Sequence, residues 1–177
     1  MEYNPDIHHR HTIRLYGYDY STEACYFITI CTQEKKCLFE RIEDGMMQMN
    51  EIGKMVEKWY FELEQKFPSL MCLDYVIMPN HFHCIIHIDN PVGADLCVRP
   101  DTPSVASLSK VVQWLKTMTT NEYYREIKLK HCASVKDKLW QRNYYEHIIR
   151  NAREYDEICN YIRTNPNRWC DDEMFVK

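Results

Sequence analysis

The sequence has none of the features that mark membrane, exported or nucleotide-hydrolysing proteins. Its 177 residues contain no apolar run of about 18, so no membrane-spanning helix is predicted. Residues 1–14 are polar and rich in histidine, unlike a secretory signal peptide, and this favours a cytoplasmic protein. The phosphate-binding pattern Gly-x-x-x-x-Gly-Lys-Ser/Thr is absent, and no internal repeat or low-complexity segment is present.

Cysteine pairs with the spacing of a zinc site are also missing. The nine cysteines are scattered, and none forms a Cys-x-x-Cys pair. An odd number of cysteines in a chain without an export signal predicts reduced thiols, several of them small core residues. The hydrophobic fraction of 45% is enough for one core, so residues 25–177 are expected to form a single domain, preceded by an arm at 1–24.

Charge is distributed unevenly along the chain. The net charge of −4 counts mildly against a nucleic-acid-binding protein. Between residues 106 and 150, however, nine Lys or Arg accompany four acidic residues, a local balance of +5. This region is a candidate DNA-binding surface, although an ordinary solvated face would have the same composition. The candidate DNA contacts in this region are Lys110, Lys116, Arg142 and Arg150, together with Arg14 from the basic, aromatic arm.

Alternating apolar residues and turn signals predict several strands and two hairpins. The hairpins are expected where Asp44-Gly45 and Pro79-Asn80 separate short apolar segments. The predicted strands are 25–32, 37–42, 46–49, 73–78 and 82–88, with a last strand within 139–149.

Helical periodicity predicts three helices. Asn50 is expected to cap a helix over 51–66, Ser107 one that ends near Ile127, and Asn151 a third. Asn165-Pro166 should end the third helix, because the residue before proline disfavours the α region. The order of elements predicts an α+β fold: a ferredoxin-like antiparallel sheet with helices packed on it, plus an extra N-terminal hairpin.

Two histidines form the centre of the candidate site. His81 and His83 are two apart on a predicted strand, so both imidazoles project from one face, while Phe82 points to the other face and a core. His87 lies roughly 13 Å along the strand from His83, too far to share one ion. From this strand pattern alone, a structural role for the two histidines is as plausible as a metal site.

A tyrosine on the last helix supplies a candidate reacting group. Tyr161 and Asn165 are four residues apart and share a helix face. Two imidazoles, an amide oxygen and a phenol suit phosphoryl transfer, with a divalent cation and a tyrosine nucleophile. Tyr155 is about 240° round the helix from Tyr161, so both cannot face the same ion. A zinc hydrolase that uses only the histidine pair is a weaker alternative.

Three motifs in order resemble those of one family. Pro79-Asn-His-Phe-His83 resembles the His-hydrophobic-His (HUH) motif of single-strand endonucleases. The segments 140–151 and 161–166 resemble those of the REP-associated tyrosine transposases, a branch of the single-tyrosine insertion-sequence transposases. The similarity extends over roughly residues 10–170.

The resemblance implies a metal-dependent endonuclease and strand transferase that acts on single-stranded, hairpin-forming palindromic DNA. It implies Mg²⁺ or Mn²⁺ and a 5′-phosphotyrosine intermediate. By motif match, His81 and His83 would be metal ligands, Asn165 a third ligand and Tyr161 the nucleophile. His147 and Arg150 lie in a family motif and would contact DNA or support the site.

Several alternatives stay open at the level of sequence. The chain could be a domesticated relative that binds hairpin DNA without cutting it. It could act as a monomer or a homodimer, with Tyr161 meeting the histidines of its own chain or of a second one. Tyr144 and Tyr145 are expected to pack or to stack on bases, and Trp140 to lie in the core.

Overall fold

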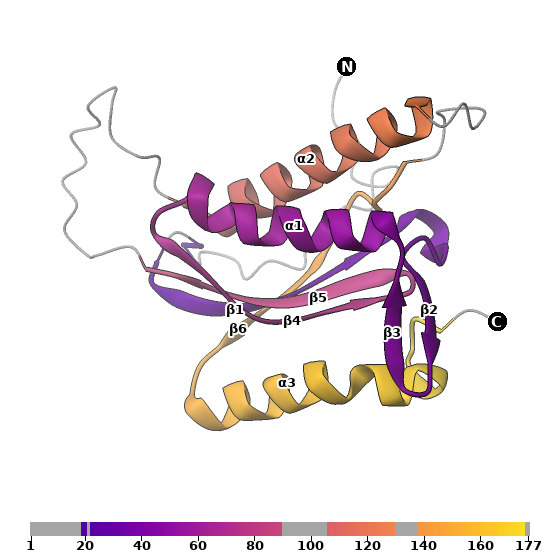
Figure 1. The fold of residues 1–177 in the computed structure, drawn as a ribbon. Helices are drawn as coiled ribbons and strands as arrows, with labels where there is room; N and C mark the ends of the chain where they lie inside the picture. Colours follow the sequence, from indigo (N-terminus) through magenta and orange to yellow (C-terminus); the bar gives the residue numbers. More distant parts are fainter. Residues whose placement is uncertain (1–18, 21, 90–105, 130–137, 176–177) are drawn as a thin grey trace, which may run out of the picture.

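The fold is built on a four-stranded antiparallel sheet with the strand order β4-β5-β1-β6. The computed structural model describes residues 19–20, 22–89, 106–129 and 138–175 (Figure 1). The predicted arm therefore lies largely outside the described residues, as does Arg14. The strands of this sheet are β1 (Ala24–Cys31), β4 (Leu70–Met78), β5 (His81–Ile88) and β6 (Tyr145–Ile149).

The helices follow the strands in the order that the sequence predicts. They are α1 (Glu51–Lys66), α2 (Leu108–Leu129) and α3 (Ala152–Thr164), with the short 3-10 helices η1 (Gln33–Lys35) and η2 (Asn165–Asp171). Apart from the β2–β3 hairpin, the order up to β6 is strand, helix, strand, strand, helix, strand. This order and the arrangement of the strands confirm the ferredoxin-like plan.

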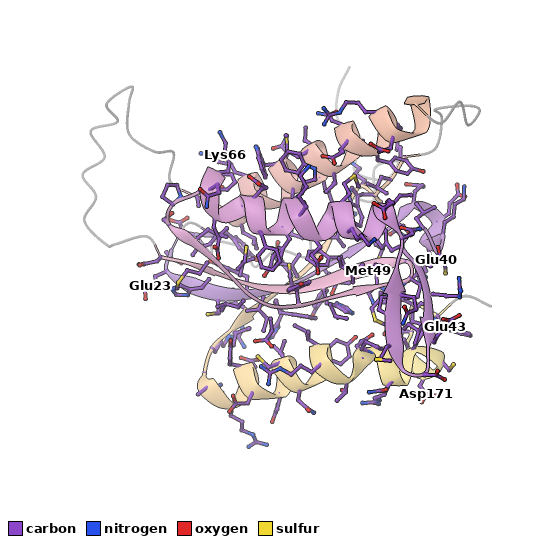
Figure 2. The ribbon with its side chains drawn as sticks, in the orientation of Figure 1. Glu23, Glu40, Glu43, Met49, Lys66 and Asp171 are labelled. Carbon is purple, nitrogen blue, oxygen red and sulfur yellow. The ribbon has the colours of Figure 1, made fainter. Side chains whose placement is uncertain are left out.

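Both faces of the sheet are covered, which makes β5 a buried strand on both sides. Helices α1 and α2 lie over one face and α3 over the other (Figure 1). Side chains fill the space between the sheet and the helices on each side (Figure 2). The larger core, under α1 and α2, contains Tyr26, Tyr60 and Phe82, and the smaller one, under α3, contains Phe27 and Ile162. Side chains on the second face of β5 therefore lie between the sheet and α3.

Asparagine side chains start two of the helices, as predicted. The Asn50 side-chain oxygen accepts hydrogen bonds from the backbone N–H groups of Ile52 (2.9 Å) and Gly53 (3.0 Å). Asn151 does the same for the backbone N–H of Glu154, at 2.9 Å. These caps fix where α1 and α3 begin.

The end of α3 differs from the prediction in one respect. The α-helix does end at Thr164, but Asn165 keeps helical angles (φ −56°, ψ −44°) and the chain continues as η2 to Asp171. The steric bias of a residue before proline is modest, and packing of this segment overrides it. The chain beyond Pro166 returns to the sheet, where the Asn80 side chain donates to the Met174 carbonyl.

A second, two-stranded sheet forms the predicted hairpin. Strands β2 (Glu40–Glu43) and β3 (Met46–Met49) are joined by Asp44 and Gly45, which both have positive φ angles of 51° and 72°. This is the conformation of the tight hairpin turns that favour Asp-Gly. A Cβ atom on Gly45 would overlap the side-chain oxygen of Asn167, so the hairpin tip packs closely against η2.

The sequence predicts reduced thiols, several of them in the core, and the described part of the chain agrees with this prediction. All seven cysteines within it are free, and Cys84 and Cys159 are buried as small core residues. Among the described helices, none combines the length and the apolar character needed to span a membrane.

Candidate active site

The histidine pair lies on β5, on the face that α3 covers. His81 and His83 are both buried, with ring centroids 4.5 Å apart. Phe82, between them, is fully buried in the core under α1 and α2. The prediction that the two imidazoles share a face opposite Phe82 is confirmed.

Hydrogen bonds fix the orientation of both imidazoles. Asn80 donates through Nδ2 to the carbonyls of Lys35 (3.1 Å) and Met174 (2.8 Å), so its Oδ1 accepts from His81 Nδ1 at 2.8 Å. His83 Nδ1 lies 2.8 Å from the Thr29 hydroxyl. His81 therefore carries its proton on Nδ1 and directs the basic Nε2 atom into the site, and His83 does the same when its Nδ1 donates to the Thr29 hydroxyl.

Burial keeps both imidazoles neutral. It lowers the pKa of His81 to about 4, although the nearby Asp172 carboxylate opposes the shift. Burial, and then the proximity of His81, lowers the pKa of His83 well below its ordinary value. His81 Nε2 is buried and has no hydrogen-bond partner among the described atoms. A neutral imidazole with an unpartnered basic nitrogen is the form that binds a metal ion.

Tyr161 of α3 reaches the histidines of its own chain. Its hydroxyl lies 3.2 Å from His83 Nε2, and its ring packs edge-on against the imidazole. Burial raises the pKa of Tyr161, and the Asn165 side chain opposes that rise. Tyr155 packs instead in the core under α3, as expected for a residue on another side of the helix.

An aspartate that the sequence did not suggest completes the cluster. The ligand atoms of His81, His83 and Asp172 all lie within 4.8 Å of one another. The backbone N–H of Met174 donates to Asp172 Oδ1 at 2.6 Å, and Asn165 Nδ2 donates to Oδ2 at 3.3 Å. Two neutral imidazoles and a carboxylate are a donor set suited to a divalent cation.

The predicted third ligand, Asn165, lies beside Asp172. It is buried, and its Oδ1 has no hydrogen-bond partner among the described atoms. The structure therefore brings together all four predicted residues of the site, and it adds a fifth. Nothing in the local pattern of the sequence singles out Asp172 from its acidic neighbours Asp171 and Glu173.

The site opens into a cavity of about 530 Å³ between the sheet and the C-terminal segment. Its lining includes Phe27, His83, Tyr145, Tyr161 and Asp172. A cavity of this size can hold a small ligand or one unit of a polymer.

The predicted DNA contacts have different surroundings. Lys110 and Arg142 are exposed, and neither lines the cavity. Lys116 is partly buried, and its ammonium donates to the carbonyls of Gln141 (3.0 Å), Arg142 (3.2 Å) and Asn143 (3.0 Å). All three N–H donors of Lys116 are thus used within the chain, so this residue is placed to hold the loop before β6. A contact between Lys116 and DNA stays a prediction.

Lys116→Met is expected to destabilise the protein by about 1–3 kcal/mol, because three carbonyls lose a charged donor. Methionine keeps most of the length of the apolar stem. Urea unfolding of Lys116→Met and of Lys110→Met, an exposed lysine on the same helix, measures the difference. Lys110→Met should change the free energy of unfolding by less than about 0.5 kcal/mol. Equal effects of the two substitutions would contradict the anchoring role.

His147 and Arg150 lie just before the start of α3, in β6 and directly after it. His147 Nε2 lies 2.6 Å from Glu154 Oε1, and the Arg150 backbone N–H donates to Glu154 Oε2 at 2.7 Å. These contacts join β6 to the first turn of α3, the helix that carries Tyr161. This geometry favours a supporting role for His147 over direct contact with DNA. The Arg150 side chain is exposed, and it remains a candidate DNA contact.

The other aromatic and histidine candidates also have clear positions. Trp140 is buried and donates from Nε1 to the Thr119 hydroxyl at 2.8 Å, so the expected core role is confirmed. Tyr144 packs on the core under α1 and α2, whereas Tyr145 is exposed beside the cavity. His87 Nδ1 contacts Cys25 Sγ at 3.3 Å, away from the histidine pair.

Comparison with known proteins yields a family and a fold. Residues 21–165 match the family model described as IS200-like transposases. An uncharacterized protein from Haemophilus influenzae is 37% identical over 183 residues, which cover 99% of this chain and 98% of that protein.

Two solved structures share the fold. One, a REP-associated tyrosine transposase bound to a REP hairpin, has a TM-score of 0.58 and 18% identity, and the match covers 89% of this chain and 73% of that one. The other, a putative transposase from Deinococcus radiodurans R1, has a TM-score of 0.50 and 12% identity, over 86% of this chain and 96% of that one.

Proposed function

The chain belongs to the family of IS200-like transposases, and we propose that it is a metal-dependent single-stranded DNA endonuclease and strand transferase that uses Tyr161 as its nucleophile. The single observation that carries the proposal is the contact between the Tyr161 hydroxyl and His83 Nε2, at 3.2 Å in one chain. A hydrolase that used only the histidines would have no need of a phenol at this place.

The reaction proceeds by exchange of one phosphate ester for another. Tyr161 Oη attacks phosphorus, and a bond forms between them as the bond from phosphorus to the 3′ oxygen breaks. The phenol proton passes to water in the open cavity, and the leaving oxygen takes up a proton to become a free 3′-OH. The DNA is left joined to Tyr161 through its 5′-phosphate. Attack by a 3′-OH on that phosphotyrosine reverses the step and joins strands without another energy source.

The residues of the chain hold the reacting group and the ion in place. His81, His83 and Asp172 would hold Mg²⁺ or Mn²⁺, with Asn165 beside them as a further oxygen donor. When bound, such an ion supplies Lewis-acid stabilisation of the charge on the phosphate. Asn80 and Thr29 orient the two imidazoles, and the Asn165 side chain orients the Tyr161 hydroxyl.

We propose single-stranded, hairpin-forming DNA from palindromic repeats as the partner. The structural relative bound to a REP hairpin supports this choice. Because Tyr161 meets the histidines of its own chain, the proposed chemistry requires only one subunit, whether the protein is a monomer or a homodimer.

The test is capture of the covalent intermediate. The purified chain is incubated with end-labelled hairpin oligonucleotides carrying single-stranded tails, with Mn²⁺ or with EDTA. We expect a protein–DNA adduct that survives a denaturing gel, that EDTA abolishes, and whose attachment site maps to Tyr161 by mass spectrometry. The adduct forms only if the phosphotyrosine does, so it reports the mechanism and not mere binding.

The same assay separates the proposal from its two rivals. Salt-sensitive binding of the oligonucleotides without any adduct under any metal condition would support a non-cleaving hairpin-binding protein. Cleavage without an adduct, with zinc as the required ion, would support a zinc hydrolase.

A further inference from the structure

An exposed tyrosine lies at the edge of the same cavity as Tyr161. We propose that Tyr145 stacks against an unpaired DNA base next to the phosphate that Tyr161 attacks, and so sets the position along the strand at which Tyr161 attacks. This inference rests on the proposed function and concerns how the same site selects its substrate.

The register of the sheet connects Tyr145 to the histidine pair. His83 on β5 pairs with Thr29 on β1, and Thr29 pairs with Tyr145 on β6. Residues that pair across antiparallel strands project from the same face, so the three side chains form one row beneath α3. Neighbouring strands are about 4.8 Å apart, which places the start of the Tyr145 side chain roughly 10 Å from that of His83. A nucleotide can extend over such a distance from phosphate to base.

The position of β6 leaves the Tyr145 ring accessible. β6 is an edge strand of the sheet, and Tyr145 is 52% exposed. A base that covered this ring would bury its apolar face. Tyr144, its neighbour, points to the opposite face of the sheet and packs on the larger core, with Lys116 Nζ 5.5 Å from its ring centroid. Tyr145 is therefore the member of the pair that is available to a ligand.

One buried phenylalanine supports both tyrosines. Phe27 meets the ring of Tyr145 edge-on at 6.5 Å and that of Tyr161 edge-on at 6.1 Å, measured between centroids. Such aromatic contacts restrict the orientation of each ring. The base-stacking ring and the proposed nucleophile are thus held in a fixed relation to each other.

The charges around the cavity indicate which part of a nucleotide lies where. The Tyr145 side of the lining is aromatic, whereas the C-terminal side contributes three carboxylates, from Asp171, Asp172 and Glu173, and the guanidinium of Arg168. An anionic phosphate is repelled by the carboxylates except where positive charge offsets them, beside Arg168 or beside a cation at the histidines. A base carries no net charge, and every base has a face that can stack on an aromatic ring. The base is therefore expected on the Tyr145 side of the cavity.

The experiment measures stacking directly, position by position. A Tyr161→Phe chain is used so that the DNA stays intact. Single-stranded tails of a hairpin oligonucleotide carry the fluorescent base 2-aminopurine at one position at a time. Stacking on Tyr145 should quench the fluorescence at one position or two adjacent positions.

Three further substitutions in this Tyr161→Phe chain identify the residue responsible. Tyr145→Leu keeps an apolar contact with Phe27 but loses the flat ring, so it should abolish the quenching and weaken DNA binding by about 5- to 150-fold. Tyr145→Phe should keep both. Phe61→Leu is the matched control, because Phe61 is a similarly exposed aromatic (47%) on α1, over the other face of the sheet, and should change neither. Unchanged melting temperatures establish that each variant is folded.

Failure of this inference can be told apart from failure of the proposed function. If Tyr145→Leu keeps the affinity and the quenching, stacking by Tyr145 is refuted, while adduct formation by the unmodified chain still stands. If quenching depends on Tyr145 but the unmodified chain never forms an adduct, the base contact stands and the nuclease proposal fails.

Discussion

Tyr161→Phe is expected to abolish the covalent adduct with DNA completely and to leave the fold unchanged. The substitution removes one oxygen atom, the proposed nucleophile, while the ring keeps its edge-on contacts with His83 and Phe27. The lost hydrogen bond to His83 is neutral and lies on a side chain that is 39% exposed. Its net contribution to the free energy of unfolding should be about 1 kcal/mol or less. The denaturing-gel assay and a thermal melt measure the two effects.

Tyr155→Phe is the matched control for this substitution. Tyr155 lies on the same helix but packs in the core under α3, away from the histidine pair. The control should form adduct as the unmodified chain does. An adduct that persists in Tyr161→Phe and disappears in Tyr155→Phe would reverse the assignment of the nucleophile.

The parts of the fold that depend on neighbouring residues could be predicted from the sequence. Asn50 and Asn151 start their helices because a side-chain oxygen close in sequence satisfies the first backbone N–H groups. Asp44-Gly45 forms a hairpin because both residues tolerate positive φ angles. The placement of His81 and His83 on one face follows from the alternation of a strand alone.

Asp172 could not be predicted, because tertiary contacts bring it to the site. It lies seven residues beyond Asn165, directly after the 3-10 helix η2. The sequence predicts the end of the helix at Asn165-Pro166 instead, because a residue before proline disfavours the α region. The segment is held by residues far away in the chain. Asn80 donates to the Met174 carbonyl, and the turn at Gly45 packs on Asn167. No periodicity within residues 166–175 encodes these contacts.

Charge counting identified a basic region but not the role of each residue. Lys110 and Lys116 are indistinguishable in the sequence, since both are basic residues of the same predicted helix. The structure distinguishes them because α2 packs beside the loop at 141–143, whose carbonyls receive the Lys116 ammonium. Only the distances between elements separate a lysine that anchors a loop from one that faces solvent.

Asp172→Asn is expected to weaken binding of Mn²⁺ by at least about tenfold in the absence of DNA. The substitution keeps the shape of the side chain, and its oxygen can still accept from the Met174 backbone N–H. It removes the only negative charge from a donor set whose other members, His81 and His83, are neutral imidazoles. Changing residues that merely orient a metal ligand costs about 10- to 100-fold in affinity, so losing a direct ligand should cost at least as much. Isothermal titration with Mn²⁺ measures the affinity without any reference to catalysis.

Asp171→Asn is the control, because it removes the same charge from the adjacent residue, which lines the cavity but is not in the His81–His83–Asp172 cluster. Mn²⁺ should raise the melting temperature of the unmodified chain and of Asp171→Asn. It should have a smaller effect on Asp172→Asn, because an ion that binds only the folded state stabilises it more the tighter it binds. Equal weakening by the two substitutions would mean that Asp172 acts only through its charge.

If Asn165→Leu removes the effect of Mn²⁺ while Asp172→Asn retains it, the third ligand is the buried Asn165 oxygen and not the Asp172 carboxylate.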